Sequence, residues 1–258
     1  MDRITRGKTR PLRHQLWLEW FSSTFLESPQ IPLRSIVDLG FGEKPFGTIE
    51  LFNACSERGY DVQIVGLETS EHRLRAARDL NHPYIEFIHG GLDALHGQSS
   101  TPLLVRALNV LRQYPPVDVP SIRKSWLHSL PTDATLTEGT TDRDGNVLAM
   151  WRLRRGAPAK LVFGATGRHG FAPNQLLAAL PCDLRWQHPK PMWLRALFQT
   201  WTEVWQTTNS EGAPLRRFTE SVQQFRQSQP TWVSSNDALE SAGLVEFNTD
   251  NIVADIGA

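Results

Sequence analysis

A buried strand that runs into a bare glycine turn is the feature that most constrains the fold of this chain. Residues Ser35–Gly42 read Ser-Ile-Val-Asp-Leu-Gly-Phe-Gly, with a short apolar run before the two glycines. Glycine adopts backbone conformations that other residues avoid, and Pro45 suits the first turn of a helix. The stretch therefore predicts a strand, a tight turn and a helix N-terminus in direct succession.

Strand and helix patterns alternate beyond this turn. Apolar residues recur every third position from Phe46 to Cys55, and Gly59 stands where a helix C-cap is expected. Such alternation favours a parallel sheet with helices on both faces, because parallel neighbours need a crossover connection. Buried strands are predicted over 36–39, 62–67, 84–88, 103–108 and 135–140, with helices between them.

The pattern changes after the fifth strand. Asp144-Gly145 is a hairpin turn signal, and apolar residues alternate from Val147 to Leu153. A further strand over Lys160–Phe163 is expected to pair beside them. We therefore predict an α/β fold, Rossmann-like and doubly wound, whose mainly parallel sheet has an antiparallel edge.

The 258 residues predict a single domain in three parts. Residues 1–30 form an N-terminal helical cap around an amphipathic helix over Leu12–Leu26, and residues 35–165 form the core. Residues 166–258 form helical or irregular additions. Bases dominate residues 152–226, whereas residues 227–258 carry acids and no base, so these two segments are expected to face one another.

Composition excludes several classes of partner. The formal net charge is zero, which gives no reason to expect a nucleic acid or an anionic membrane surface. No apolar run of 18 residues occurs, and the first residues lack the apolar core of a signal peptide. Cys55 and Cys182 lie in apolar surroundings and are expected to be reduced thiols. These features predict a soluble, cytoplasmic protein.

Four stretches stand at predicted strand ends: the acid-x-Gly-x-Gly motif at residues 38–42, Glu68 at the end of the second strand, Gly90-Gly91-Leu92-Asp93 after the third, and the fourth strand with Asn109. Together they resemble the corresponding motifs of class I S-adenosylmethionine-dependent methyltransferases. The resemblance is closest to uncharacterised bacterial members in which a strand ends Asn-Val-Leu-Arg-Gln-Tyr. It spans roughly residues 35–140.

The resemblance implies S-adenosylmethionine as cofactor and methyl transfer to a small-molecule acceptor. A carboxylate such as Glu68 is a natural acceptor for both ribose hydroxyls. The implied cofactor-binding residues are Asp38, Gly40, Phe41 and Gly42 for the methionine part, Glu68 with Thr69 for the ribose, Gly91 and Leu92 for the adenine, and Asn109 beside the methyl group. Arg112 and Tyr114 are candidates on the substrate side, and no catalytic residue is assigned.

Two alternatives remain open. A nicotinamide-dependent oxidoreductase also has a glycine turn followed by an acid. However, Pro45 stands where its third glycine belongs and offers no N–H to a pyrophosphate, and Glu68 lies 26 residues beyond Gly42 rather than roughly 20. The other alternative is a non-catalytic binding or regulatory module, which is favoured by Lys44 and Gly91 where the family pattern has other residues.

The acceptor pocket is expected to be covered by the N-terminal helix and by the Trp193–Trp205 segment, whose aromatic residues favour an apolar or aromatic acceptor. His82, His89 and His96 recur every seven residues, a spacing that is not that of helical metal ligands, and no His-Glu-x-x-His motif occurs. We therefore expect no metal site.

Overall fold

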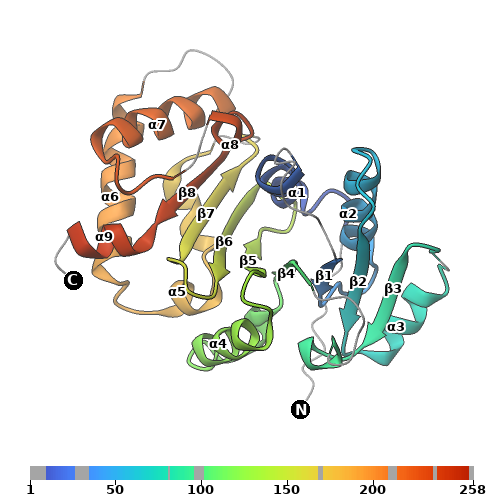
Figure 1. Cartoon of the computed structure of the whole chain (residues 1–258). Helices are drawn as coiled ribbons and strands as arrows, with labels where there is room; N and C mark the ends of the chain where they lie inside the picture. The colour runs from blue at the N-terminus through green and yellow to red at the C-terminus, as the bar shows by residue number, and fades with distance from the viewer. Residues whose placement is uncertain are drawn as a thin grey trace.

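Eight strands form one continuous sheet in the order β3-β2-β1-β4-β5-β6-β7-β8 in the computed structural model (Figure 1). It describes residues 10–26, 35–80, 82–95, 102–167, 171–208, 214–234 and 237–255. The strands are β1 (Ser35–Leu39), β2 (Gln63–Glu68), β3 (Ile85–His89), β4 (Leu104–Leu108), β5 (Thr135–Thr141), β6 (Val147–Arg154), β7 (Lys160–Ala165) and β8 (Leu244–Asn248).

The first five strands are parallel, and helices connect them. β1 pairs with β2 on one side and with β4 on the other, so the strand order reverses at β1. In open α/β sheets a crevice opens at such a reversal, beyond the carboxyl ends of the strands. The connecting helices are α2 (Phe46–Ser56), α3 (Glu71–Arg78) and α4 (Val119–Ser129), with short 3-10 helices η2 (Leu92–Leu95) and η3 (Leu111–Gln113).

The last three strands form the antiparallel edge. β5 and β6 form a hairpin through the predicted Asp144-Gly145 turn, in which Gly145 has φ 74°. β7 and β8 follow in alternating direction. The predicted α/β fold is therefore confirmed, and β8 extends the sheet beyond it, in a segment for which helical or irregular structure was expected.

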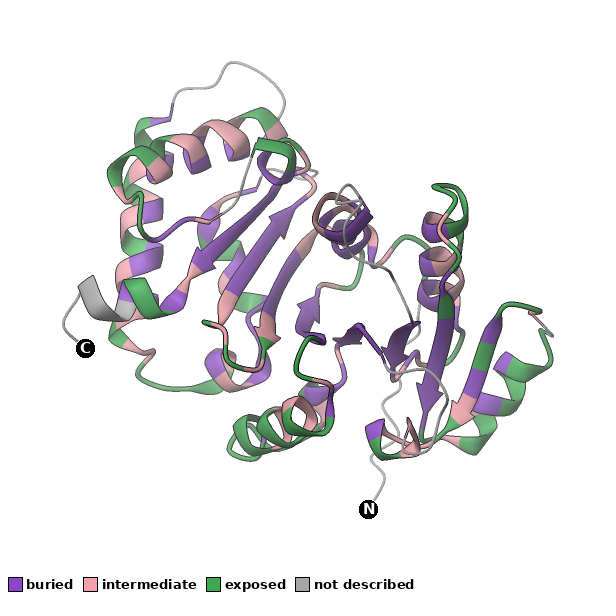
Figure 2. Cartoon of the chain, viewed as in Figure 1, coloured by how far each residue is buried: buried purple, intermediate pink, exposed green. Residues whose placement is uncertain are grey.

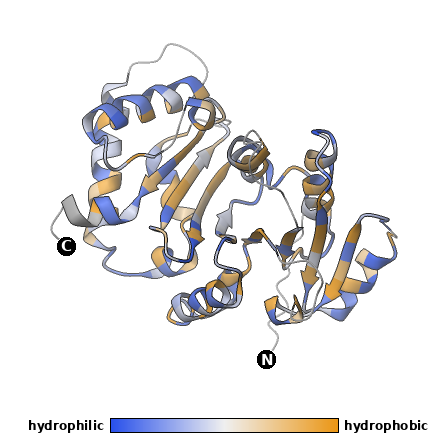
Figure 3. Ribbon diagram, viewed as in Figure 1, coloured by the Kyte–Doolittle hydropathy of each residue, from blue (hydrophilic) through white to orange (hydrophobic). Residues whose placement is uncertain are grey.

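Helices cover both faces of the sheet. One face packs against α1 (Gln15–Phe21), α2 and α8 (Asp237–Ser241) through residues such as Ile36, Leu104 and Val162. The other packs against α4 near β1 and β4, and against α6 (Met192–Thr207) and α7 (Pro214–Ser228) near β7 and β8. Most strand residues are accordingly buried in Figure 2 and many are apolar in Figure 3, although the edge strand β3 is partly exposed, whereas the outer faces of α3 and α4 are exposed and hydrophilic.

The N-terminal helix is shorter than predicted. α1 begins at Gln15, after Leu12 with φ 59°, and continues as a π-helical turn, η1 (Ser22–Leu26). Two indoles fix it to the sheet: Trp17 Nε1 donates to Thr137 Oγ1 at 3.0 Å, and Trp20 Nε1 donates to Glu246 Oε1 at 2.8 Å. α1 thereby bridges β5 and β8.

The C-terminal additions surround a second aromatic core. Trp201 of α6 is fully buried and contacts rings from β7, β8 and α7. Three short helices also lie in this part of the chain: the 3-10 helix η4 (Pro173–Ala178), α5 (Cys182–Trp186) and α9 (Thr249–Asp255). The Trp193–Trp205 segment therefore packs on the sheet.

The predicted meeting of the basic and acidic segments is confirmed. Buried Glu246 of β8 contacts Arg152 at 3.1 Å and Lys160 at 3.4 Å, and Arg226 of α7 pairs with Asp237 and with Glu240. The acid in β8 is thus neutralised by neighbouring strands.

Cys55 and Cys182 are buried free thiols, as expected. Within the described residues, no helix has both the length and the apolar composition needed to cross a bilayer. Nor does this part of the chain contain a group of three or more His, Cys, Asp or Glu side chains able to hold a metal ion. His96 lies outside the described residues.

Candidate functional site

A cavity of about 2240 Å³ opens at the carboxyl ends of β1, β2, β4 and β5. This is where the reversal of strand order at β1 leaves a crevice. Ten of the eleven residues that the sequence singled out line it: Gly40, Phe41, Gly42, Glu68, Thr69, Gly91, Leu92, Asn109, Arg112 and Tyr114.

The turn after β1 needs its two glycines. Gly40 has φ 70° and Gly42 has φ 85°, both in the left-handed region. The Gly40 N–H donates to Leu67 O at 2.7 Å, and a Cβ at Gly40 would lie 2.9 Å from the side chain of Val110. The turn therefore presents bare backbone to the cavity.

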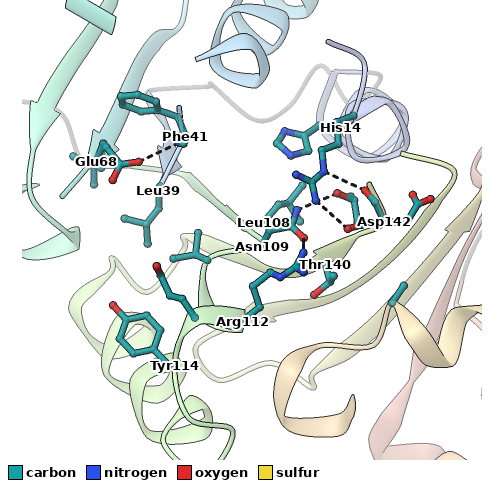
Figure 4. Close-up of a pocket in the computed structure, with 18 of the residues that line it drawn as sticks. His14, Leu39, Phe41, Glu68, Leu108, Asn109, Arg112, Tyr114, Thr140 and Asp142 are labelled. Carbon is teal, nitrogen blue, oxygen red and sulfur yellow. Dashed lines mark hydrogen bonds between the residues drawn. The ribbon is translucent and has the colours of Figure 1, made fainter. Parts of the chain in front are cut away.

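Glu68 lies beside this turn at the end of β2. Its carboxylate accepts the N–H of Gly42 and the N–H of Ser70, each at 3.1 Å, and Arg73 is 3.5 Å away (Figure 4). The side chain is buried but faces the cavity. These backbone bonds hold the carboxylate in place, where it can accept hydroxyl hydrogens from a ligand.

Apolar side chains line the cavity beyond Glu68. Phe41 stacks edge-on against Phe87 with ring centroids 5.3 Å apart, and Leu92 is buried in η2. Gly66 makes room for both rings, because a Cβ there would lie 2.8 Å from Phe87. A flat apolar group can lie against this wall.

Asn109 follows β4 with φ 63°, a conformation that asparagine tolerates better than most residues. Its N–H donates to Gly139 O at 2.7 Å, and its Nδ2 donates to Thr141 Oγ1 at 3.0 Å. Arg112 Nη1 donates to Asn109 Oδ1 at 3.1 Å. Asn109 thus joins the ends of β4 and β5 at the middle of the cavity (Figure 4).

Asp38 is the predicted site residue that does not line the cavity. Its carboxylate is buried and accepts Arg106 Nε at 3.0 Å, Arg106 Nη2 at 2.7 Å and Thr48 Oγ1 at 2.6 Å. Although burial opposes its charge, Arg106 holds the pKa of Asp38 below its usual value. The acid of the glycine motif therefore contacts β4 and α2, with its side chain directed away from the cavity.

Sequence reasoning missed the far end of the cavity. Arg13 and His14 reach it from the start of the chain, and the β5–β6 hairpin contributes residues 140–143, 146 and 147. Gly145 allows this meeting, because a Cβ there would lie 2.7 Å from Arg13 O. The hairpin turn was visible in the sequence, but its contact with a segment more than a hundred residues earlier was not.

The expected cover of the cavity is only partly present. Arg10, Arg13 and His14, just before α1, line it, whereas the Trp193–Trp205 segment does not. Phe171 and Gln175, near and within η4, and Arg185 of α5 line the far side instead. The prediction of an aromatic lining from α6 is therefore wrong, because those rings fill the core beneath β7 and β8.

Comparison with known proteins gives a limited result. No family model and no curated protein matches the chain. Among solved structures, the plantazolicin methyltransferase BamL, in complex with a triazolic desmethylPZN analog and SAH, is 16% identical over 50% of this chain and 46% of its own, with a TM-score of 0.37. A Pyrococcus horikoshii protein is 17% identical over 60% and 79%, with a TM-score of 0.38.

LepI, in complex with SAM, is 16% identical over 48% of this chain and 30% of its own, with a TM-score of 0.36. The chain thus spans less than half the length of two of these proteins. Similarity of this extent is no evidence of a shared ligand or activity, since one fold hosts many functions.

Proposed function

We propose that the protein binds S-adenosylmethionine and transfers its methyl group to a small-molecule acceptor. The observation that carries the proposal is the pairing of the Gly40–Gly42 turn with the Glu68 carboxylate, 3.1 Å from the Gly42 N–H, at the wall of one large cavity. A bare backbone suits the methionine part, and a fixed carboxylate suits a ribose diol.

The remaining walls fit the other parts of this cofactor. Leu92 offers an apolar surface for adenine, with Gly91 beside it, Phe41 lies in the glycine turn at the methionine part, and Thr69 follows Glu68 at the ribose. Asn109 borders the region between the turn and the far end, where the methyl group and the acceptor would meet.

Methyl transfer from this cofactor makes few demands on side chains. The sulfonium supplies an activated methyl group, so the protein has mainly to hold the acceptor in line with it and to exclude water. Pro45, at the N-cap of α2, disfavours the pyrophosphate of a nicotinamide nucleotide, because it has no N–H to donate.

Calorimetric titration with S-adenosylhomocysteine tests the cofactor. We expect binding to the intact chain and none of a nicotinamide nucleotide. Glu68→Ala should weaken this binding by about 1.5–3 kcal/mol, or about 10- to 150-fold, because hydrogen bonds to a charged group are lost. Glu57→Ala removes the same charge from an exposed position outside the cavity and should leave the affinity unchanged.

Failure of S-adenosylhomocysteine to bind would refute the proposal, and unchanged affinity in Glu68→Ala would refute the role of Glu68. Release of S-adenosylhomocysteine from S-adenosylmethionine with an added acceptor distinguishes a methyltransferase from a binding module that retains the cofactor.

A further inference from the structure

The cavity has two ends of different charge. Its cofactor end carries the acids Glu68, Glu71 and Asp93, with Arg73 beside them. The far end, beyond Asn109, is lined by arginines and by one carboxylate, Asp142. The arginines there are Arg10, Arg13, Arg112, Arg143 and Arg185.

Arg13 and Arg112 are held close to the same short segment. Arg13 Nε donates to Asp142 O at 3.1 Å and its Nη2 to Thr141 O at 3.4 Å. Arg112 reaches Thr141 through Asn109, which bonds to both. Figure 4 shows Arg112, Asn109 and Asp142 converging at this end of the cavity.

Within the described part of the chain, no side-chain carboxylate oxygen of Asp or Glu lies within 4.0 Å of either guanidinium group, whereas Arg10 is paired with Asp144 at 2.9 Å. Arg13 contacts the backbone carbonyl of Asp142, whose Oδ1 accepts the N–H of Val147. Arg13 and Arg112 together carry two positive charges, against the single negative charge of Asp142.

The surroundings of Arg13 disfavour its positive charge. Burial lowers the pKa of Arg13, and the charge of Arg112 lowers it further. The hydrogen bonds described above use two of the five N–H groups of Arg13 and one of those of Arg112. The remaining N–H groups form planar forks that match the oxygens of a carboxylate or a phosphate.

We propose that Arg13 and Arg112 bind an oxyanion, a carboxylate or phosphate group of the acceptor. That this group belongs to the acceptor rests on the proposed function, which assigns the opposite end to the cofactor. The acceptor is then an anionic small molecule, and the anion anchors it so that its nucleophilic atom lies beside Asn109.

Calorimetry with simple probes tests the site without any methyl transfer. Benzoate, inorganic phosphate and neutral benzamide are titrated into the chain alone and into the chain saturated with S-adenosylhomocysteine. We expect at least one anion to bind in both forms and benzamide not to bind. Binding of benzoate but not of phosphate identifies a carboxylate site, and binding of phosphate but not of benzoate identifies a phosphate site.

Variants locate the binding. Arg112 is exposed, so Arg112→Gln should fold normally and weaken anion binding by about tenfold or more, the scale of a lost charge-assisted bond. Arg13→Gln should have a similar effect. Arg154→Gln, at an exposed arginine outside the cavity, is the matched control and should bind the anion like the unaltered chain.

Three outcomes would overturn the inference: neither anion binds, binding survives both Arg112→Gln and Arg13→Gln, or S-adenosylhomocysteine abolishes binding. The last would assign the arginines to the carboxylate of the cofactor itself. Arginine-dependent anion binding without any binding of S-adenosylhomocysteine would instead leave the anion site standing and refute the proposed function.

Discussion

His14 is an ionisable side chain enclosed next to a cation. It lies against Gly47, where a Cβ would come within 2.5 Å of its Nδ1, and near Arg106. Burial, and then the charge of Arg106, lower the pKa of His14 to about 3, from an unfolded value near 6.5, although Asp38 opposes the shift. His14 is therefore neutral in the folded chain at neutral and mildly acidic pH.

This shift predicts acid sensitivity. Between about pH 6.5 and 3 the unfolded chain binds a proton at His14 that the folded chain does not, so stability falls as the pH falls, by at most about 1.4 kcal/mol per pH unit. Urea unfolding at pH 7.5 and pH 5 should show a smaller loss for His14→Gln than for the unaltered chain. His128→Gln, at an exposed histidine, serves as control, and equal losses in all three proteins would contradict the assignment.

At the residue level, the position of a residue along a strand predicted its place in the site better than its residue type did. Glu68 and Asn109 were predicted as site residues because both stand at the carboxyl ends of strands that the alternating pattern predicted. Such ends meet at one edge of a parallel sheet. Asp38 also stands near such an end, but strand alternation turns its side chain toward α1 and α2. Its partner Arg106 interrupts an otherwise apolar strand, which was the available signal.

At the level of elements, the Asp38–Arg106 pair joins β1 to β4 and reaches α1. Arg106 is fully buried, and its guanidinium lies 4.7 Å from the ring of Trp17. Since two strands and a helix share one buried ion pair, the pair fixes how the glycine turn sits relative to Asn109.

Removing one partner of the Asp38–Arg106 pair should cost more free energy of unfolding than replacing both partners. Asp38→Asn leaves Arg106 buried without a counter-charge, and we expect a loss of about 3–5 kcal/mol in the free energy of unfolding. Arg106→Met should cost a similar amount for the same reason. The double variant should lose clearly less than the sum of the two in urea unfolding, whereas additive losses would show that the two charges are not coupled.

Element type was predictable where a pattern was long, and less so near the chain end. The parallel strands β1, β2 and β4 are mostly apolar, as is typical of strands buried on both faces. β8 is five residues long and carries Glu246 at its centre, so its apolar residues do not form a pattern that predicts a strand. Arg152, Lys160 and the indole of Trp20, all distant in sequence, make that acid tolerable inside the sheet.

At the level of the whole molecule, one hydrogen-bonded sheet runs from β3 to β8, and α1 contacts both its parallel and its antiparallel parts. We therefore predict one cooperative unfolding transition. Hydrogen exchange in rising urea, followed on peptides from β1–β4 and from β6–β8, should show protection lost at the same urea concentration. Two separate midpoints would divide the chain into independently folding units.

The β5–β6 hairpin lies three strands away from Glu68, and it brings residues 140–143, 146 and 147 to the far end of the cavity without contributing to the glycine turn. Mutations at its tip can therefore alter what the far end admits while β1 and β2 keep their sequence. For laboratory evolution this separation is useful: a library restricted to this one hairpin would vary the lining of the far end and leave the glycine turn and Glu68, the proposed cofactor contacts, unchanged.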